Sequence, residues 1–104
     1  MAYSISWTES AILAVADAAE YIAKDSPSYA AALVAKTETA ANSLDQFPKR
    51  GRVVPEYRDT AIRELFVGRY RLIYRVHHQT VTILAFVHGA RDLEALLPNL
   101  DLSQ

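Results

Sequence analysis

The sequence predicts an α+β domain in which a small antiparallel β-sheet packs against a two-helix hairpin. Apolar residues alternate over a short N-terminal stretch, recur at helical spacing over the next two segments, and alternate again over three C-terminal segments. The order β-α-α-β-β-β requires the N-terminal strand to join the other three in one sheet, with the helices on one face. A chain of 104 residues has the usual size of one domain, so we expect residues 1–104 to form a single unit.

The N-terminal strand and the first helix are predicted from residues 2–24. "AYSISW" alternates large and small residues, which is typical of a short strand. Thr8 can cap the helix that follows, over residues 9–24, and Glu9 is favourable in its first turn. The predicted core stripe of this helix is Ile12, Val15, Ala19 and Ile22.

The second helix is predicted over residues 27–46. Ser26 can cap it, and Pro27 suits the first helical position because its missing N–H would have had no partner there. The predicted core stripe is Ala30, Leu33, Thr37, Ala41 and Leu44. The connection between the helices is short, so they should lie antiparallel, and the alanines in both stripes let them pack closely.

Three strands are predicted after a loop. "FPKRGRVVPEYRDT", residues 47–60, contains two Pro, one Gly and four Lys or Arg, which is typical of a loop. Strands should follow over residues 61–67, 70–76 and 81–88, with a two-residue turn at 68–69 and a four-residue turn at 77–80. The segment "GARDLEALLPNL" is a candidate for a short final helix before Pro98.

The turns predict which residues share each face of the sheet. They place Val67 opposite Tyr70 and Val76 opposite Val81, and continued pairing places Tyr70 opposite Val87. One face is then apolar and should contact the helices, with Arg63 beside Tyr74 in either a structural role or a contact with the target. The other face, which we call the open face, collects Ile62, Glu64, Phe66, Arg71, Ile73, Arg75, Thr82, Leu84, Phe86 and His88.

The open face mixes cations with aromatic and aliphatic residues, a composition that favours an interaction surface over one that meets only water. The predicted partner-binding residues are Phe66, Arg71, Arg75, Leu84, Phe86 and Arg91. In the alternative interpretation, Glu64 pairs with Arg71 and Arg75 across the strands while the C-terminal helix covers the rest.

Composition narrows the class of protein. The chain has no cysteine, which excludes disulfides and thiolate chemistry. Neither a signal peptide nor an apolar run of membrane-spanning length is recognisable, so we expect a cytoplasmic protein without membrane contact. Residues 46–80 contain eight Lys or Arg against three Asp or Glu, although the whole chain has a net charge of −1. This local excess favours an anionic partner, and the alternative is an ordinary solvated face.

Four segments together resemble the RelE/ParE superfamily, the toxins of bacterial type II toxin–antitoxin pairs. They are "WTESAILAVADAAEYIAKDSPSYAAALV", "LDQFPKRGRVVPE", "IRELFVGRYRLIYRV" and "VTILAFVHGARDL", and the resemblance spans about residues 3–93. The loop "GRVVPE" and the C-terminal strands look more like the ParE-type branch than the RelE-type branch. The resemblance implies a small sheet backed by a helical hairpin, and a cognate antitoxin that wraps around the toxin in a hetero-oligomer.

The two branches imply different targets. ParE-type members inhibit DNA gyrase without catalysis, whereas RelE-type members are metal-independent endoribonucleases that cleave mRNA on the ribosome. The resemblance to ParE-type members therefore implies a growth inhibitor that acts on gyrase, with RNA cleavage as the alternative. A third possibility is a non-toxic member that only binds an antitoxin and contributes to autorepression.

The residues that a nuclease would need are incomplete. Phe66 stands where RelE-type members commonly place an arginine, and Leu97 stands where they place a tyrosine. Arg91 matches an arginine after the last strand, and His88 is a candidate general acid or base, so these two residues are the catalytic candidates if the chain is a nuclease. We expect no cofactor and no metal, because adjacent His77 and His78 should point apart and no carboxylate lies at ligand spacing.

Overall fold

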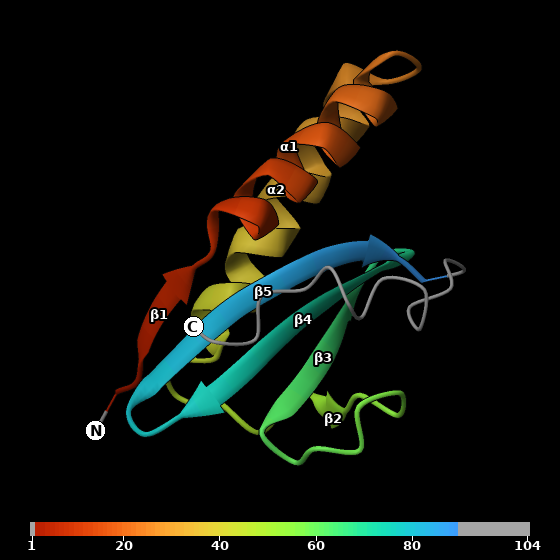
Figure 1. Cartoon of the computed structure of the whole chain (residues 1–104). Coiled ribbons are helices and arrows are strands. Elements are labelled where there is room, and N and C mark those ends of the chain that lie inside the picture. Colours follow the sequence, from red (N-terminus) through yellow and green to blue (C-terminus); the bar gives the residue numbers. More distant parts are fainter. Residues whose placement is uncertain (1, 90–104) are drawn as a thin grey trace.

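The computed structural model describes residues 2–89, in which two helices pack against a five-stranded sheet (Figure 1). The elements in chain order are β1 (Ser4–Trp7), α1 (Glu9–Ala23), α2 (Pro27–Ser43), β2 (Arg52–Val53), β3 (Ile62–Val67), β4 (Tyr70–His77) and β5 (Thr80–His88). The predicted α+β class is confirmed, and the predicted β-α-α-β-β-β order is confirmed with one additional short strand, β2, before the last three. The candidate final helix and Arg91 lie outside the described residues.

The sheet has the strand order β1-β5-β4-β3-β2 and is mixed, since β1 pairs with β5 in parallel while the other pairs are antiparallel. The prediction of a purely antiparallel sheet was therefore wrong for β1. Alternation of side chains reveals the faces of a strand but not its direction. The N–H of Thr8 donates to the carbonyl of Ile83 where the chain leaves β1 and enters α1, which continues the parallel pairing.

Strand β2 lies within the segment that the sequence predicts to be a loop. Its two residues, Arg52 and Val53, pair with Glu64 and Arg63 of β3. A strand this short shows no periodicity in the sequence, because two residues cannot establish alternation. Strand β2 brings the side chain of Arg52 alongside that of Glu64, and this proximity shapes the candidate site.

Both helices begin at the predicted caps. The hydroxyl of Thr8 accepts the N–H of Ala11 at 3.1 Å, and the hydroxyl of Ser26 accepts the N–H of Tyr29 at 3.2 Å. Helix α2 ends at Ser43, three residues before the predicted end, and its predicted stripe is buried throughout. In α1 the prediction was wrong for Ile12, which is 53% exposed while its neighbour Ala11 is fully buried.

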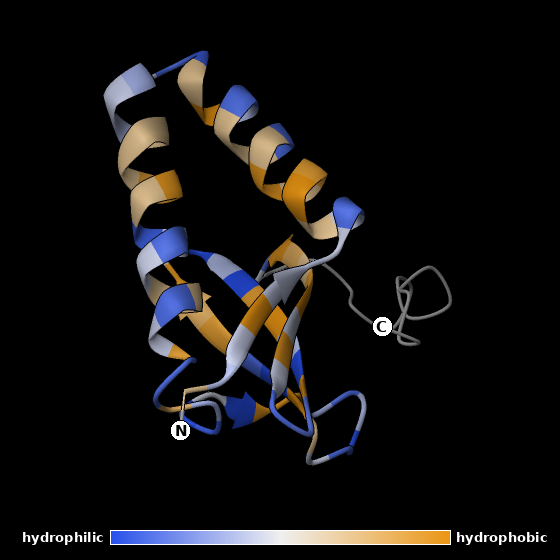
Figure 2. Ribbon diagram, turned by 90° about the vertical axis from the view of Figure 1, so that its left-hand side faces the viewer, coloured by the Kyte–Doolittle hydropathy of each residue, from blue (hydrophilic) through white to orange (hydrophobic). Residues whose placement is uncertain are grey.

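The arrangement of the helices explains the position of Ile12. The two helices splay apart from their shared turn toward the sheet, and hydrophobic and hydrophilic residues alternate along the strands (Figure 2). Between the helices lies a cavity of about 380 Å³, lined by Trp7, Ile12, Val15, Val34, Thr37, Glu38 and Asn42. Ile12 faces this cavity and the solvent, so the helix turns its alanines, Ala11, Ala14 and Ala18, toward the core.

The core has two parts, one on each face of the sheet. The larger cluster lies between the helices and the sheet and includes Leu33, Leu44, Leu72, Tyr74, Ile83 and Phe86. The smaller cluster lies on the opposite face and consists of Val54, Ile62, Ile73, Leu84 and Ala85, with Tyr57 and Val87 packed against it. Burial of each large aliphatic side chain contributes roughly 1.5–3 kcal/mol before entropy is subtracted. The open face is therefore largely covered, and residues 54–60, which we call the covering loop, supply part of its cover.

A β-bulge changes the register of β5. Tyr74 lies opposite Ile83, as predicted, but Ile73 lies opposite Ala85, so Leu84 is the extra residue. The predicted pairing of Tyr70 with Val87 was therefore wrong. Beyond the bulge every side chain of β5 lies on the face opposite to the predicted one, because the side-chain period of a strand is two. The carbonyl of Leu84 accepts the hydroxyl of Thr8 at 3.4 Å, which ties the bulge to the start of α1.

None of the helices within residues 2–89 is both long enough and apolar enough to cross a bilayer.

Candidate partner-binding surface

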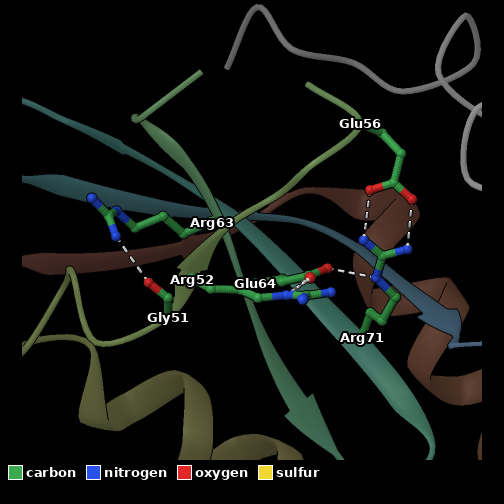
Figure 3. A network of polar contacts seen from close by, with 6 residues as sticks. All are labelled: Gly51, Arg52, Glu56, Arg63, Glu64 and Arg71. Carbon is green, nitrogen blue, oxygen red and sulfur yellow. Dashed lines mark hydrogen bonds and ion pairs between the residues drawn. The ribbon is translucent and has the colours of Figure 1, made fainter. Parts of the chain in front are cut away.

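A chain of ion pairs crosses the open face (Figure 3). The carboxylate of Glu64, on β3, accepts hydrogen bonds from Arg52 Nε and from Arg71 Nε, each at 2.5 Å. The other two nitrogens of Arg71 donate to the two oxygens of Glu56, at 2.9 and 3.0 Å. Strands β2, β3 and β4 and the covering loop each contribute one residue to this network.

The network is more deeply buried than a surface ion pair. The side chain of Glu64 is fully buried and that of Arg71 is 6% exposed, whereas that of Arg52 is 56% exposed. Removal of charge from water is unfavourable, so such groups need complete hydrogen bonding, which the two arginines provide for Glu64. The pKa of Glu56 lies below its ordinary value because Arg71 donates hydrogen bonds to it, and the pKa of Arg71 is raised, chiefly by its bonds to Glu56.

A second group of polar contacts fixes Gly51 on the helix-covered side of the sheet. The N–H of Gly51 donates to the phenolic oxygen of Tyr74 at 3.0 Å, and its carbonyl accepts Nη1 of Arg63 at 2.9 Å. Burial raises the pKa of Tyr74. Arg63 thus lies beside Tyr74, as predicted, and has a structural role, which is one of the two roles that the sequence leaves open.

The covering loop changes the accessibility of the predicted partner-binding residues. Phe66 remains 57% exposed, and the guanidinium of Arg52 lies over its ring at 5.2 Å from the centroid, in cation–π geometry. Arg75 lies on the same face, opposite Ile62 and Thr82, and is half-buried. Arg71 is on the predicted face but is 5% exposed and engaged with two carboxylates.

Leu84 and Phe86 do not lie at the surface as predicted. Leu84 is 2% exposed and belongs to the small core beneath the covering loop. Phe86 is 4% exposed and lies on the opposite face, within the main core, where its ring stacks on Tyr70 with centroids 4.7 Å apart. The physical reason is the bulge at Leu84, which moves Phe86 to the helix-covered face. The prediction that both residues face outward on the open face was therefore wrong.

His88 also changes face. It lies opposite Tyr70, and its ring meets the Tyr70 ring edge-on at 5.4 Å between centroids. It lines a cavity of about 300 Å³ together with Tyr21, Ile22, Tyr29, Leu33, Arg69 and Tyr70. His88 is thus separated by the sheet from Arg71, and the two residues cannot act on one group.

Sequence reasoning assigned no role to Arg52 and Glu56, which complete the ion-pair network. The signal that could have found them is the predicted register, which already places buried Glu64 diagonally across from Arg71. A carboxylate inside a basic segment needs cations, and Arg52 is one of the four basic residues of the preceding segment, residues 47–60. The alternative interpretation correctly paired Glu64 with Arg71, but its second partner is Arg52 and not Arg75.

The arrangement is suited to binding and poorly suited to phosphate chemistry. Every nitrogen of the Arg71 guanidinium donates to a carboxylate, so this cation is already neutralised. Among the described residues no group of three or more His, Asp or Glu side chains could hold a metal ion. A small α+β domain with arginines and an exposed phenylalanine at one sheet face has the composition of a protein-interaction module.

Comparison with known proteins identifies the family. The family described as the ParE toxin of the type II toxin–antitoxin system parDE matches residues 5–93, and the chain belongs to this family. No individual curated protein sequence matches the chain.

Two solved structures are similar to the chain. The chromosomal ParDE toxin–antitoxin system from P. aeruginosa has a TM-score of 0.68 and 20% sequence identity, over 83% of this chain and 95% of that one. At this identity the likeness concerns the fold alone. The RelBE2 toxin–antitoxin complex from Mycobacterium tuberculosis has a TM-score of 0.56 and 29% identity, over 88% of this chain and 95% of that one.

Proposed function

We propose that this chain is neutralised by a cognate antitoxin and, when released, inhibits growth by binding DNA gyrase without catalysis. The family match places the chain among ParE toxins. The observation that carries the choice of gyrase over RNA is the full engagement of Arg71. Three of its five N–H donors are bound by Glu56 and Glu64, and these two carboxylates balance its charge, so Arg71 is poorly suited to stabilise a scissile phosphate.

Binding to an antitoxin is supported by the exposed part of the candidate surface. Phe66 and Arg52 combine an accessible aromatic ring with an accessible cation, as interface hot spots commonly do. Arg75 and Arg91 are the further basic candidates for this contact. An acidic antitoxin segment would fold as it binds, adding helix or strand to the toxin.

The antitoxin proposal is tested with the product of the neighbouring gene. Co-expression should restore growth, and the two purified chains should elute together in gel filtration. Failure of both results with every adjacent small reading frame would contradict this part of the proposal.

The gyrase proposal is tested with a supercoiling assay. Purified toxin added to gyrase and relaxed plasmid should reduce the formation of supercoiled product, and toxin premixed with antitoxin should not. Full gyrase activity at high toxin excess would exclude gyrase as the target.

Cleavage of mRNA on the ribosome is the second candidate, and the cavity at His88 is the observation that favours it. This cavity is lined by both His88 and Arg69, so it places an imidazole that can act as a general acid or base in the same cavity as a cation. The test is incubation of the toxin with programmed ribosomes. Cleavage that is lost in His88→Ala while ribosome binding persists would establish the nuclease, and intact mRNA would exclude it.

A further inference from the structure

A second basic site lies where the segment after α2, the start of β3 and the end of β4 meet. It is a cavity of about 300 Å³ lined by Tyr3, Lys49, Thr60, Ala61, Arg63, Val76 and His78. This volume is at the lower end of the range for small-molecule sites, roughly 300–1,000 Å³. None of these residues belongs to the Glu64 network or to the cavity at His88.

The lining is electropositive. Lys49 and Arg63 are cations, His78 contributes an imidazole, and Thr60 and Tyr3 each carry a hydroxyl group. No carboxylate is among the lining residues. The carboxylate of nearby Asp59 accepts the backbone N–H of Ala61 at 2.9 Å. A concave site with several donors and no acid among its lining residues attracts anions.

Arg63 has a donor that the protein does not use. Its Nη1 donates to the carbonyls of Gly51 at 2.9 Å and Lys49 at 3.4 Å, which holds the guanidinium in place. Its Nε is buried and has no hydrogen-bond partner within residues 2–89. The two carbonyls therefore fix a cationic side chain in the lining of the cavity, whereas the buried Nε is closed to a ligand.

The turn between β4 and β5 positions the histidine. His78 adopts a left-handed backbone conformation with φ of 54°, which the two-residue turn requires. Its ring packs against that of His77, with centroids 4.2 Å apart. The imidazole is thus held at the rim of the cavity by the turn and by its neighbour.

We propose that this cavity binds the phosphate group of a small molecule. An oxyanion with several acceptor oxygens matches a lining whose donors come from four separate segments of the chain, and charge-assisted hydrogen bonds are the strong ones. The ligand is either free phosphate or a phosphorylated small molecule. This inference does not depend on the gyrase proposal, since it concerns different residues and a different partner.

The test is a titration of the full chain with inorganic phosphate and, separately, with adenosine 5′-monophosphate, at constant ionic strength set with chloride. Backbone amide NMR signals of residues 60–63 and 76–79 should shift saturably. Tighter binding of the nucleotide would identify a phosphorylated molecule as the ligand class, and equal binding would identify the free anion.

Three variants separate this site from general electrostatic attraction. Lys49→Gln removes an exposed cation from the lining, and His78→Gly removes the imidazole at a position where glycine adopts a positive φ freely. Each should weaken phosphate binding by about tenfold, the usual size of one charge-assisted contact. Arg50→Gln is the matched control, because Arg50 bonds Ser43 and does not line the cavity.

The control also defines the result that would overturn the proposal. Equal weakening by Arg50→Gln and Lys49→Gln would mean that phosphate senses only net charge. Absence of saturable shifts with both ligands would also overturn the proposal. If His78→Gly fails to fold, as judged by circular dichroism, Lys49→Gln still decides the matter.

Discussion

Tyr70 and His88 lie directly opposite each other on β4 and β5, and their rings meet edge-on at 5.4 Å between centroids. Both side chains therefore lie on the side of the sheet that the helices cover, while Arg71, the next residue on β4, points to the other side. The bulge at Leu84 produces this arrangement, because it inverts the last residues of β5. A single inserted residue thus separates the histidine and the arginine that the sequence places on one face.

Loss of the buried carboxylate of Glu64 should destabilise the fold. Glu64→Gln removes the charge that satisfies Arg71 Nε inside the sheet, and we expect a decrease in the free energy of unfolding of about 3 kcal/mol. Urea denaturation followed by circular dichroism measures this decrease. Glu20→Gln on the exposed face of α1 is the control and should change stability by less than about 0.5 kcal/mol. A loss for Glu64→Gln no larger than the control would show that the network contributes nothing.

The ion pair of Glu56 with Arg71 should make stability depend on pH. The pKa of Glu56 is lowered from 4.5 in the folded chain, so folding favours its ionised form. The contribution of this ion pair to the free energy of unfolding is complete above pH 4.5. It is lost as the pH falls through the lower pKa that Glu56 has in the folded chain. Glu56→Gln should therefore reduce stability by about 1–2 kcal/mol at pH 7 and progressively less below pH 4.5.

The measurement is chemical denaturation of both chains at a series of pH values, with Glu38→Gln as an exposed control on α2. A difference between Glu56→Gln and the unmodified chain that stays constant down to acidic pH would contradict the assigned ion pair.

Gly51 should not tolerate a side chain. A Cβ at this position would lie 2.5 Å from the carbonyl oxygen of Glu64 and 2.6 Å from the hydroxyl oxygen of Tyr74. We expect Gly51→Ala to destabilise the chain by about 2 kcal/mol or more, since the carbonyl belongs to the backbone of β3 and cannot move aside cheaply.

Tyr74→Phe tests the same contact from the other side. It leaves the buried N–H of Gly51 without its acceptor, which should reduce stability by about 1–2 kcal/mol. In the Tyr74→Phe background, Gly51→Ala should remain destabilising because Glu64 is still in the way. Thermal unfolding of the three variants gives the comparison, and a neutral Gly51→Ala would mean that the close approach is absent.

Replacement of Phe66 should affect binding of the antitoxin, whereas replacement of Phe86 should affect stability. Phe66→Ala removes a side chain that is 57% exposed, so it should change stability little and weaken binding of the antitoxin by about tenfold or more. Phe86→Ala opens a cavity in the main core and should reduce stability by about 3–5 kcal/mol. Surface plasmon resonance with immobilised antitoxin, together with urea denaturation, separates the two effects. Unchanged affinity in Phe66→Ala would remove this residue from the proposed interface.

The fold class could be predicted from the sequence because its signals are local. The caps at Thr8 and Ser26 depend on a hydroxyl two or three residues before an N–H, and both are confirmed. The buried stripe of α2 and the turn at 68–69 likewise follow from spacing within one segment. The predicted four-residue turn at 77–80 was wrong in length, because His77 pairs with Thr80 and leaves a two-residue turn. The resemblance to the toxin family follows from the order of the four segments quoted in the sequence analysis.

The candidate site could not be predicted in the same way, because its residues depend on tertiary structure. Alternation assigns faces only while the strand stays regular, and nothing in "VTILAFVH" marks the extra residue at Leu84. The partners of Arg71 come from a two-residue strand and from a loop, whose positions relative to β4 are set by packing over the small core.

By itself, the sequence determined the kinds of element, their order and the basic character of the middle third of the chain, since propensity, capping and charge are properties of neighbouring residues. Only the tertiary structure decided which arginines are neutralised, which phenylalanine meets solvent and on which side of the sheet His88 lies. These outcomes depend on one bulge and on carboxylates that approach from distant segments, and pairwise contacts of this kind form only when the chain has folded.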